Sequence, residues 1–345
     1  MTFSLQRLLR KNIRDINPYS TARDEFQGIA SVYLDANESP FDSDINRYPD
    51  PMQHELKVKV SRIKNVHPHQ IFLGNGSDEA IDLIYRAFCE PGRDNVVAMK
   101  PTYGMYKVAA DINDVTYKEV LLNDDYQLNA TEVLDTVNKR TKAIFLCSPN
   151  NPTANSLVRE DVLYILNKFN GIVVLDEAYI DFSTRESYVN VLNDYPNLVV
   201  LQTFSKAWGM AGVRLGMSFA SKEITEVFNN IKYPYNVNVL TQKKVLEMLD
   251  KVDEKNENVQ VILNERKSLV IGLKELECVD LVYSSDANFV LVKVPNPKGM
   301  YDYLLKSEII VRDRSNVALC EGCLRITIGT PDENKILLKA LKAYK

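Results

Sequence analysis

The chain has 345 residues, of which 45% are hydrophobic, so it can bury a large core and is long enough for two domains. Its 42 lysines and arginines are offset by 46 aspartates and glutamates, and the formal net charge of −4 argues against nucleic acid as a partner. Apolar runs such as residues 171–175 stop far short of the roughly 20 residues that cross a bilayer, so we expect no membrane association.

The cysteines and the first residues favour the cytoplasm as the location. Residues 1–20 scatter basic side chains and lack the continuous apolar core of a signal peptide. The chain has five cysteines, an odd number, spread without the density of a disulfide scaffold. Cys320 and Cys323 form a CxxC motif, but no second pair accompanies them and residues 324–328 alternate like a strand, so no metal site is predicted.

In chain order, an N-terminal segment punctuated by prolines predicts an irregular arm, and an α/β pattern follows from about residue 68 to residue 220. Four runs of consecutive apolar residues predict strands covered on both faces of a mostly parallel sheet: 96–99, 143–147, 172–175 and 198–201. After about residue 251 the pattern predicts a smaller α+β domain, with a charged helix, strands at 288–292 and 309–311, and a closing helix around 335–344.

A glycine-rich turn at residues 74–79 follows an apolar run and opens a predicted helix, so its free amides and Gly76 could receive a phosphate group. The alternative is an ordinary helix capped by Ser77 or Asp78. The turn lacks the terminal lysine of a P-loop and the third glycine of a dinucleotide fingerprint, which weakens an ATP or NAD interpretation.

Asp176 comes directly after four apolar residues, where an isolated charge is costly, so it requires a cationic partner. A protonated pyridine nitrogen of pyridoxal phosphate would serve, and Tyr179 could then reach the phenolic oxygen of the same cofactor. The alternative is a structural aspartate that accepts hydrogen bonds from nearby amides.

The most specific group combines Thr203, Ser205, Lys206 and Arg214, which offer hydroxyls, an amine and a guanidinium within twelve residues. A lysine with a lowered pKa can carry a carbonyl cofactor covalently, and its neighbours can hold a phosphate. A lone lysine is normally a solvated surface residue, but the upstream strand, Gly209 and Gly212 argue against a plain surface helix.

Together these motifs resemble the fold type I aminotransferases that use pyridoxal phosphate, and among them the histidinol-phosphate aminotransferases. The resemblance runs nearly end to end, over residues 17–19, 34–40, 47–51, 74–79, 101–103, 148–153, 176–179, 205–206 and 324–327. One departure is Ala154, where a glycine is common, and this puts only the local turn in doubt.

The resemblance implies a role for each matching residue. Lys206 would hold the cofactor covalently and act as general base, Asp176 would bind the pyridine nitrogen, and Tyr103 would stack on the ring. Asn151 and Tyr179 would contact the phenolic oxygen. The phosphate would lie among Ser77, Asp78, Thr203, Ser205 and Arg214, with Tyr48 reaching it from a partner subunit, and the substrate would face Tyr19, Asn37, Arg312 and Arg325.

The resemblance also implies an architecture and a reaction. Residues 1–45 would form an arm that contributes to the small domain and to dimer contacts, 46–255 a large cofactor-binding domain, and 256–345 a small C-terminal domain. The expected assembly is a homodimer with shared active sites. The expected reaction converts L-histidinol phosphate and 2-oxoglutarate to imidazole acetol phosphate and L-glutamate, in histidine biosynthesis.

Other functions share the same motifs. They are an aromatic or broad-specificity amino-acid aminotransferase, a threonine-phosphate decarboxylase dependent on pyridoxal phosphate, and a non-catalytic regulator, for which the sequence offers no DNA-reading module. The three histidines, His54, His67 and His69, lie in polar stretches, are expected to be exposed, and receive no role.

Overall fold

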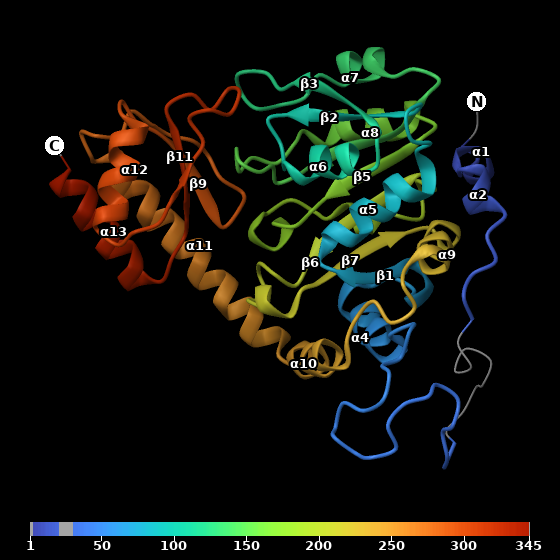
Figure 1. Ribbon diagram of the computed structural model, residues 1–345. Helices are drawn as coiled ribbons and strands as arrows, with labels where there is room; N and C mark the ends of the chain where they lie inside the picture. The colour runs from blue at the N-terminus through green and yellow to red at the C-terminus, as the bar shows by residue number, and fades with distance from the viewer. Residues whose placement is uncertain (1–2, 21–29, 345) are drawn as a thin grey trace.

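The computed structural model describes residues 3–20 and 30–344, and it contains a large α/β part beside a smaller α+β part (Figure 1). The large part is built on a seven-stranded sheet with the order β1-β7-β6-β5-β4-β2-β3. β7 is antiparallel to both of its neighbours, and the other paired strands run parallel. The strands are β1 Ile71–Asn75, β2 Asn95–Lys100, β3 Thr116–Leu121, β4 Thr141–Cys147, β5 Ile172–Asp176, β6 Leu198–Thr203 and β7 Leu215–Ala220.

Consecutive apolar residues form these strands because helices cover both faces of the sheet. In β2, Val97 and Met99 belong to one core cluster and Val96 and Ala98 to the other, as the alternation of side chains along a strand requires. Residues of α4, α7, α8 and α10 join the first cluster, and residues of α5, α6 and α9 join the second. These helices are α4 His54–Lys64, α5 Ser77–Phe88, α6 Met105–Ile112, α7 Ala130–Thr136, α8 Arg159–Lys168, α9 Lys222–Ile231 and α10 Val239–Leu249.

The smaller part follows a long helix, α11, which starts beside the large part and ends in the small one (Figure 1). Its four-stranded antiparallel sheet has the order β10-β11-β9-β8 and packs on α12 and α13 around a core of its own. The elements are α11 Val252–Lys274, β8 Leu281–Val282, β9 Phe289–Lys293, α12 Pro297–Lys306, β10 Arg312–Asp313, β11 Cys323–Thr327 and α13 Pro331–Ala343.

Two short helices, α1 Leu5–Leu8 and α2 Lys11–Arg14, precede an irregular segment. They pack on the large part: Leu9 is buried in the same core cluster as Phe88, and the Arg10 amide donates to the Ala87 carbonyl at 3.0 Å. Short 3₁₀ helices complete the fold, at η1 Pro68–Gln70, η2 Ile180–Phe182, η3 Tyr188–Val191 and η4 Ala211–Val213.

The predicted α/β fold, the four predicted sheet strands and the closing helix are confirmed. The strand predicted at residues 309–311 is wrong, because the Ile309 amide donates to the Leu304 carbonyl at the end of α12 and β10 begins only at Arg312.

His54, His67 and His69 are exposed, as predicted. Within the described residues, no helix has the length and apolarity to cross a bilayer. The three-part division of the chain stays a prediction.

Candidate active site

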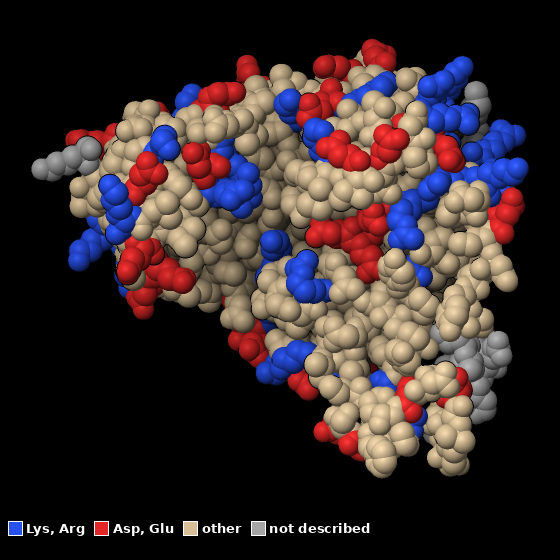
Figure 2. Space-filling model, in the orientation of Figure 1, with Lys and Arg blue, Asp and Glu red and all other residues tan. Residues whose placement is uncertain are grey.

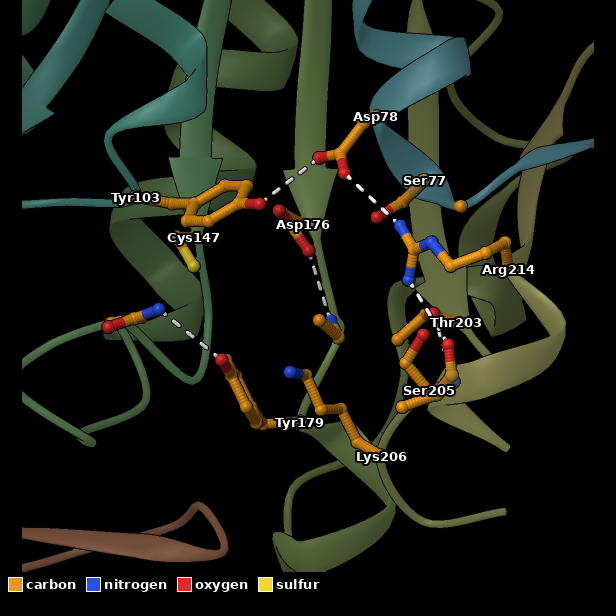
Figure 3. A pocket seen from close by; sticks show the side chains of 14 residues that line it. Ser77, Asp78, Tyr103, Cys147, Asp176, Tyr179, Thr203, Ser205, Lys206 and Arg214 are labelled. Atoms are coloured by element: carbon orange, nitrogen blue, oxygen red, sulfur yellow. Dashed lines mark hydrogen bonds and ion pairs between the residues drawn. The ribbon is translucent and has the colours of Figure 1, made fainter. Parts of the chain in front are cut away.

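The carboxyl ends of the large sheet surround one cavity, where polar residues that are distant in sequence come together (Figure 3). This is the edge at which parallel α/β sheets bind ligands. β6 leads to Thr203, Ser205 and Lys206, and β5 leads to Asp176 and Tyr179. The other lining residues are Gly76, Ser77, Asp78, Tyr103, Cys147, Asn151, Ala178, Ala211 and Arg214.

One end of the cavity has the features of a phosphate site. Helix α5 starts at Ser77 and no side chain caps it, so the capped-helix alternative is wrong and the first-turn amides are left to a ligand. Gly76 has φ +71°, and a Cβ there would lie 2.9 Å from Arg214 Nη2. The Arg214 guanidinium lies 3.8 Å from Asp78 and points into the same corner as Ser205 (Figure 3).

Asp176 forms the floor of the cavity. It is 3% exposed, and its carboxylate accepts hydrogen bonds from the Tyr106 hydroxyl at 2.7 Å and the Ala178 amide at 3.1 Å. Burial raises the pKa of Asp176 to about 6, although these two hydrogen bonds act in the opposite direction. A buried carboxylate with a raised pKa is stabilised by a cationic group placed next to it, so this floor suits a protonated ring nitrogen.

Lys206 points into the cavity between Asp176 and Tyr179 (Figure 3), and its ammonium lies 5.6 Å from the centre of the Tyr179 ring. Its pKa is lowered, first by partial desolvation and then by the positive charge of Arg325. A lysine with a lowered pKa has a larger neutral fraction and is a better nucleophile and base. Among the described residues it has no hydrogen-bond partner, so the amine is available for chemistry.

Tyr179 and Tyr103 line the remaining walls. The Asn151 amide donates to the Tyr179 hydroxyl at 3.3 Å, and burial raises the Tyr179 pKa, so this phenol stays a neutral donor. The Tyr103 hydroxyl donates to Asp78 at 3.1 Å, which holds its ring across the cavity (Figure 3). Both tyrosines therefore line the same cavity.

Comparison with known proteins agrees with this geometry. The family model described as aminotransferase class I and II matches residues 17–341. The chain belongs to this aminotransferase family. A histidinol-phosphate aminotransferase of Bacteroides fragilis is 56% identical over 343 residues, covering 99% of each chain.

Solved structures show the same fold. The histidinol-phosphate aminotransferase from Clostridium acetobutylicum matches with a TM-score of 0.80 and 24% identity, over 87% of this chain and 90% of that one. The histidinol-phosphate aminotransferase from Sinorhizobium meliloti, in complex with pyridoxal-5'-phosphate, matches with a TM-score of 0.78 and 24% identity, over 89% of this chain and 88% of that one. At this level of identity the likeness supports the aminotransferase fold.

Two predicted arginines of this aminotransferase lie on the small sheet. Arg312 and Arg325 are directly opposite each other in the β10–β11 pair, and Arg325 donates a short hydrogen bond to the Asn151 side chain. The Arg325 guanidinium also lies 5.2 Å from the centre of the Phe289 ring. Like charges opposite each other repel, so the pair favours an anion between the two parts of the molecule.

Arg312 and Arg325 do not line the cavity itself, and three further predicted site residues are not brought to it within one chain. Tyr19 is 75% exposed, Asn37 is exposed in a left-handed conformation with φ +53°, and Tyr48 stacks on Tyr235 with ring centres 4.3 Å apart. None of the three lines the cavity described above. Their roles stay predictions, and for Tyr48 the prediction requires a second subunit.

Two residues with a place in the site were missed by sequence reasoning. Tyr106, buried in α6, donates to Asp176 across 70 residues of sequence, and nothing local distinguishes it from the other tyrosines. Arg314 follows β10, and its amide donates to the Cys323 carbonyl at 2.9 Å. Burial and then the positive charges of Arg325 and Arg312 lower its pKa, which places its guanidinium near the two predicted arginines. Its Nε is buried and makes no hydrogen bond in the described structure, and the i, i+2 spacing from Arg312 was the signal available.

The turn at Ala154, where the sequence departs from the usual glycine, has φ +69° and is fully buried. The left-handed backbone conformation that favours glycine is therefore present with an alanine in it. The Asn151 side chain still reaches Tyr179, so the departure leaves the predicted cofactor contact in place.

Proposed function

We propose that this aminotransferase moves the amino group of L-histidinol phosphate to 2-oxoglutarate, yielding imidazole acetol phosphate and L-glutamate, in cytoplasmic histidine biosynthesis. The observation that carries the proposal is Lys206, an amine without a hydrogen-bond partner among the described residues, which lies between a buried carboxylate and a phosphate cradle. The full-length similarity to histidinol-phosphate aminotransferases supports the choice of substrate.

The residues around the cavity fit pyridoxal phosphate. Asp176 offers the buried anion that its ring nitrogen needs, the uncapped start of α5 with Ser77 and Arg214 suits its phosphate, and Lys206 can hold it covalently. Tyr103 and Tyr179 line the part of the cavity that would hold the ring. Once bound, this cofactor withdraws electrons from the carbon that carries the substrate amine.

The chain's own groups then carry out the proton transfers. With the cofactor bound, Lys206 Nζ would act as the base that takes the proton from the substrate carbon bearing the amine, and it would hold that proton for its return. Its lowered pKa gives a neutral amine near pH 7 more readily than an ordinary lysine would. The Tyr106 and Ala178 hydrogen bonds orient Asp176, and the phosphate cradle fixes the reacting carbon beside Lys206.

The arginines of the small part account for the anionic groups of both substrates. The amino donor carries a phosphate and the amino acceptor carries carboxylates, and a guanidinium fork binds either. Arg312, Arg314 and Arg325 form no ion pair within the described residues. This positive cluster, joined to the cavity through Asn151, supports a phosphorylated amine as the substrate.

The proposed assembly is a homodimer in which Tyr48 completes the phosphate site of the other subunit. Large apolar side chains remain exposed in one chain along residues 30–50 and near α10, including Leu34, Phe41, Ile45 and Leu240. Large exposed apolar side chains of this kind are typical of an interface. Dimer formation would cover these side chains and bring the arm near the second cavity.

The proposed function can be tested on Lys206 directly. Borohydride reduction of the protein loaded with pyridoxal phosphate should fix the cofactor on a peptide containing Lys206, and Lys206→Ala should abolish turnover. Lys222→Ala, an exposed lysine on α9, is the matched control and should retain full activity. A label on another lysine would contradict the assignment. Carbon dioxide released from threonine phosphate without a keto acid would favour the decarboxylase instead.

A further inference from the structure

A second hollow lies at the opposite edge of the large sheet, and it is lined mostly by cations. Eight of its twelve lining residues are lysine or arginine. They come from three separate segments, with Arg7 and Lys11 on α1 and α2, Arg93 after α5, and Lys139 and Arg140 before β4. Figure 2 shows Lys and Arg side chains gathered at the upper right, where α1 and α2 lie in Figure 1.

The charge of this hollow is not balanced by its own acids. Glu90 lies 3.5 Å from Arg10, and Asp94 lies 3.7 Å from Lys142. The other six cations have no carboxylate within ion-pair distance in the described part of the chain. The Arg10 atom that faces Glu90 is the buried Nε, and Arg10 Nη1 donates to the Arg86 carbonyl at 3.2 Å. Like charges that converge without counter-charges repel each other, and a bound anion relieves that repulsion.

The hollow is separate from the catalytic cavity. β2 and β4 begin beside it, at Asn95 and Thr141, and both strands lead toward the active site at their carboxyl ends. A strand of this length spans about 20 Å at roughly 3.3 Å per residue. An anion in the hollow would therefore not touch Lys206, and pyridoxal phosphate in its own site would not fill the hollow.

We propose that this basic hollow binds a small polyphosphate, such as the diphosphate or triphosphate part of a metabolite. Six cations that have no carboxylate partner among the described residues surround one concavity, and they suit three or four negative charges on a compact ligand. One phosphate or carboxylate would leave most of them without a counter-charge. The apolar lining residues, Leu9 and Phe88, are buried and offer no face for a nucleobase, so recognition rests on the phosphates. The net charge of −4 on the whole chain disfavours an extended nucleic acid.

The test uses the full chain saturated with pyridoxal phosphate, so that the catalytic phosphate site is filled, and tripolyphosphate as the probe. Calorimetric titration at fixed ionic strength should show one site per chain, with affinity that falls steeply as salt is added. The double variant Lys139→Gln/Arg140→Gln removes two exposed cations of the hollow and should weaken binding at least tenfold. The matched control, Lys222→Gln/Lys298→Gln, loses the same charge elsewhere and should bind as the wild type does.

Three results would overturn the proposal. One is that the Lys139→Gln/Arg140→Gln variant binds tripolyphosphate with the same affinity as the Lys222→Gln/Lys298→Gln control. Another is binding of inorganic phosphate as tight as that of tripolyphosphate at matched ionic strength, since a single phosphate would then suffice. The third is a short RNA that displaces tripolyphosphate and binds more tightly. Transamination by each variant, measured in parallel, confirms that it is folded, because no substituted residue lies in the active site.

Discussion

Burial of the Asp176 carboxylate lowers the stability of the cofactor-free protein, and the bound cofactor should restore that stability. The folded pKa of Asp176 is raised to about 6 from an ordinary value of 3.8, so the folded state binds more protons than the unfolded chain between these pH values. The free energy of unfolding of the cofactor-free protein should therefore fall as pH rises from about 4 to about 6, and the loss should persist above pH 6. The shift corresponds to about 3 kcal/mol at roughly 1.4 kcal/mol per pKa unit.

This prediction is checked by urea unfolding of the cofactor-free protein across that pH range. Asp176→Asn should flatten the dependence, because it removes the buried titrating group, while Asp302→Asn, on an exposed turn of α12, should leave it unchanged. Saturation with pyridoxal phosphate should also reduce the loss, since its ring nitrogen supplies the missing positive charge. An identical slope in wild type and Asp176→Asn would show that Asp176 is not the group responsible.

Among the elements, the start of α5 depends on a glycine whose φ of +71° an L-residue adopts only with strain. Gly76→Ala should lower the affinity for pyridoxal phosphate at least tenfold, because the new Cβ would displace the Arg214 guanidinium 2.9 Å away. Spectroscopic titration of the cofactor-free protein measures this. Gly104→Ala is the matched control, since its φ is −65° and its Cβ would meet no atom within 4 Å. Equal affinities of the Gly76→Ala and Gly104→Ala variants for pyridoxal phosphate would show that Gly76 does not contribute to the phosphate site.

The arginines on and directly after the β10–β11 pair, Arg312, Arg314 and Arg325, should discriminate between the two substrates. Arg314→Met keeps most of the side-chain length but removes the guanidinium, and it should raise the KM for histidinol phosphate about tenfold, as expected for losing one charged hydrogen bond. The KM for 2-oxoglutarate should change less than about twofold, because a phosphate dianion attracts a third cation more strongly than a carboxylate does. Arg314→Lys should recover part of the loss. Equal rises for both substrates would indicate a structural role for Arg314.

At the scale of the whole molecule, the proposed homodimer with shared active sites predicts complementation between two inactive variants. In a mixed dimer of Lys206→Ala and Tyr48→Ala chains, one site would carry both defects and the other neither. After subunit exchange, activity should return to as much as half of the wild-type rate per mixed dimer. If Tyr48 acted within its own chain, both sites would stay defective, and mixed dimers would be no more active than the parent variants. Light scattering of the wild type and of each separate variant should show the proposed dimer in every case.

Much of the fold and the core of the site could be predicted because they depend on short stretches of chain. Consecutive apolar residues identified four strands of the large sheet, since burial on both faces requires them. Lys206, Asp176 and the Gly76 turn each follow an apolar run in the sequence, and they line one cavity because ligand-binding residues gather at the carboxyl ends of parallel strands. The misplaced strand at 309–311 arose because apolar residues at a helix end resemble a short buried strand.

Tertiary structure alone decided which distant side chains meet. Tyr106 supports Asp176 from a helix 70 residues earlier, Arg312 faces Arg325 through strand register, and the basic hollow assembles from three separate segments. Tyr19, Asn37 and Tyr48 lie outside the cavity of one chain. The sequence motifs therefore predicted these residues for the site but did not show where they act. The sequence by itself determined the elements and the chemistry at their ends, because periodicity and turn residues act locally. The packing of the sheet and helices determined which side chains contact each other and which charges are balanced. These contacts depend on distances between residues that are far apart in the sequence, so no local pattern predicts them.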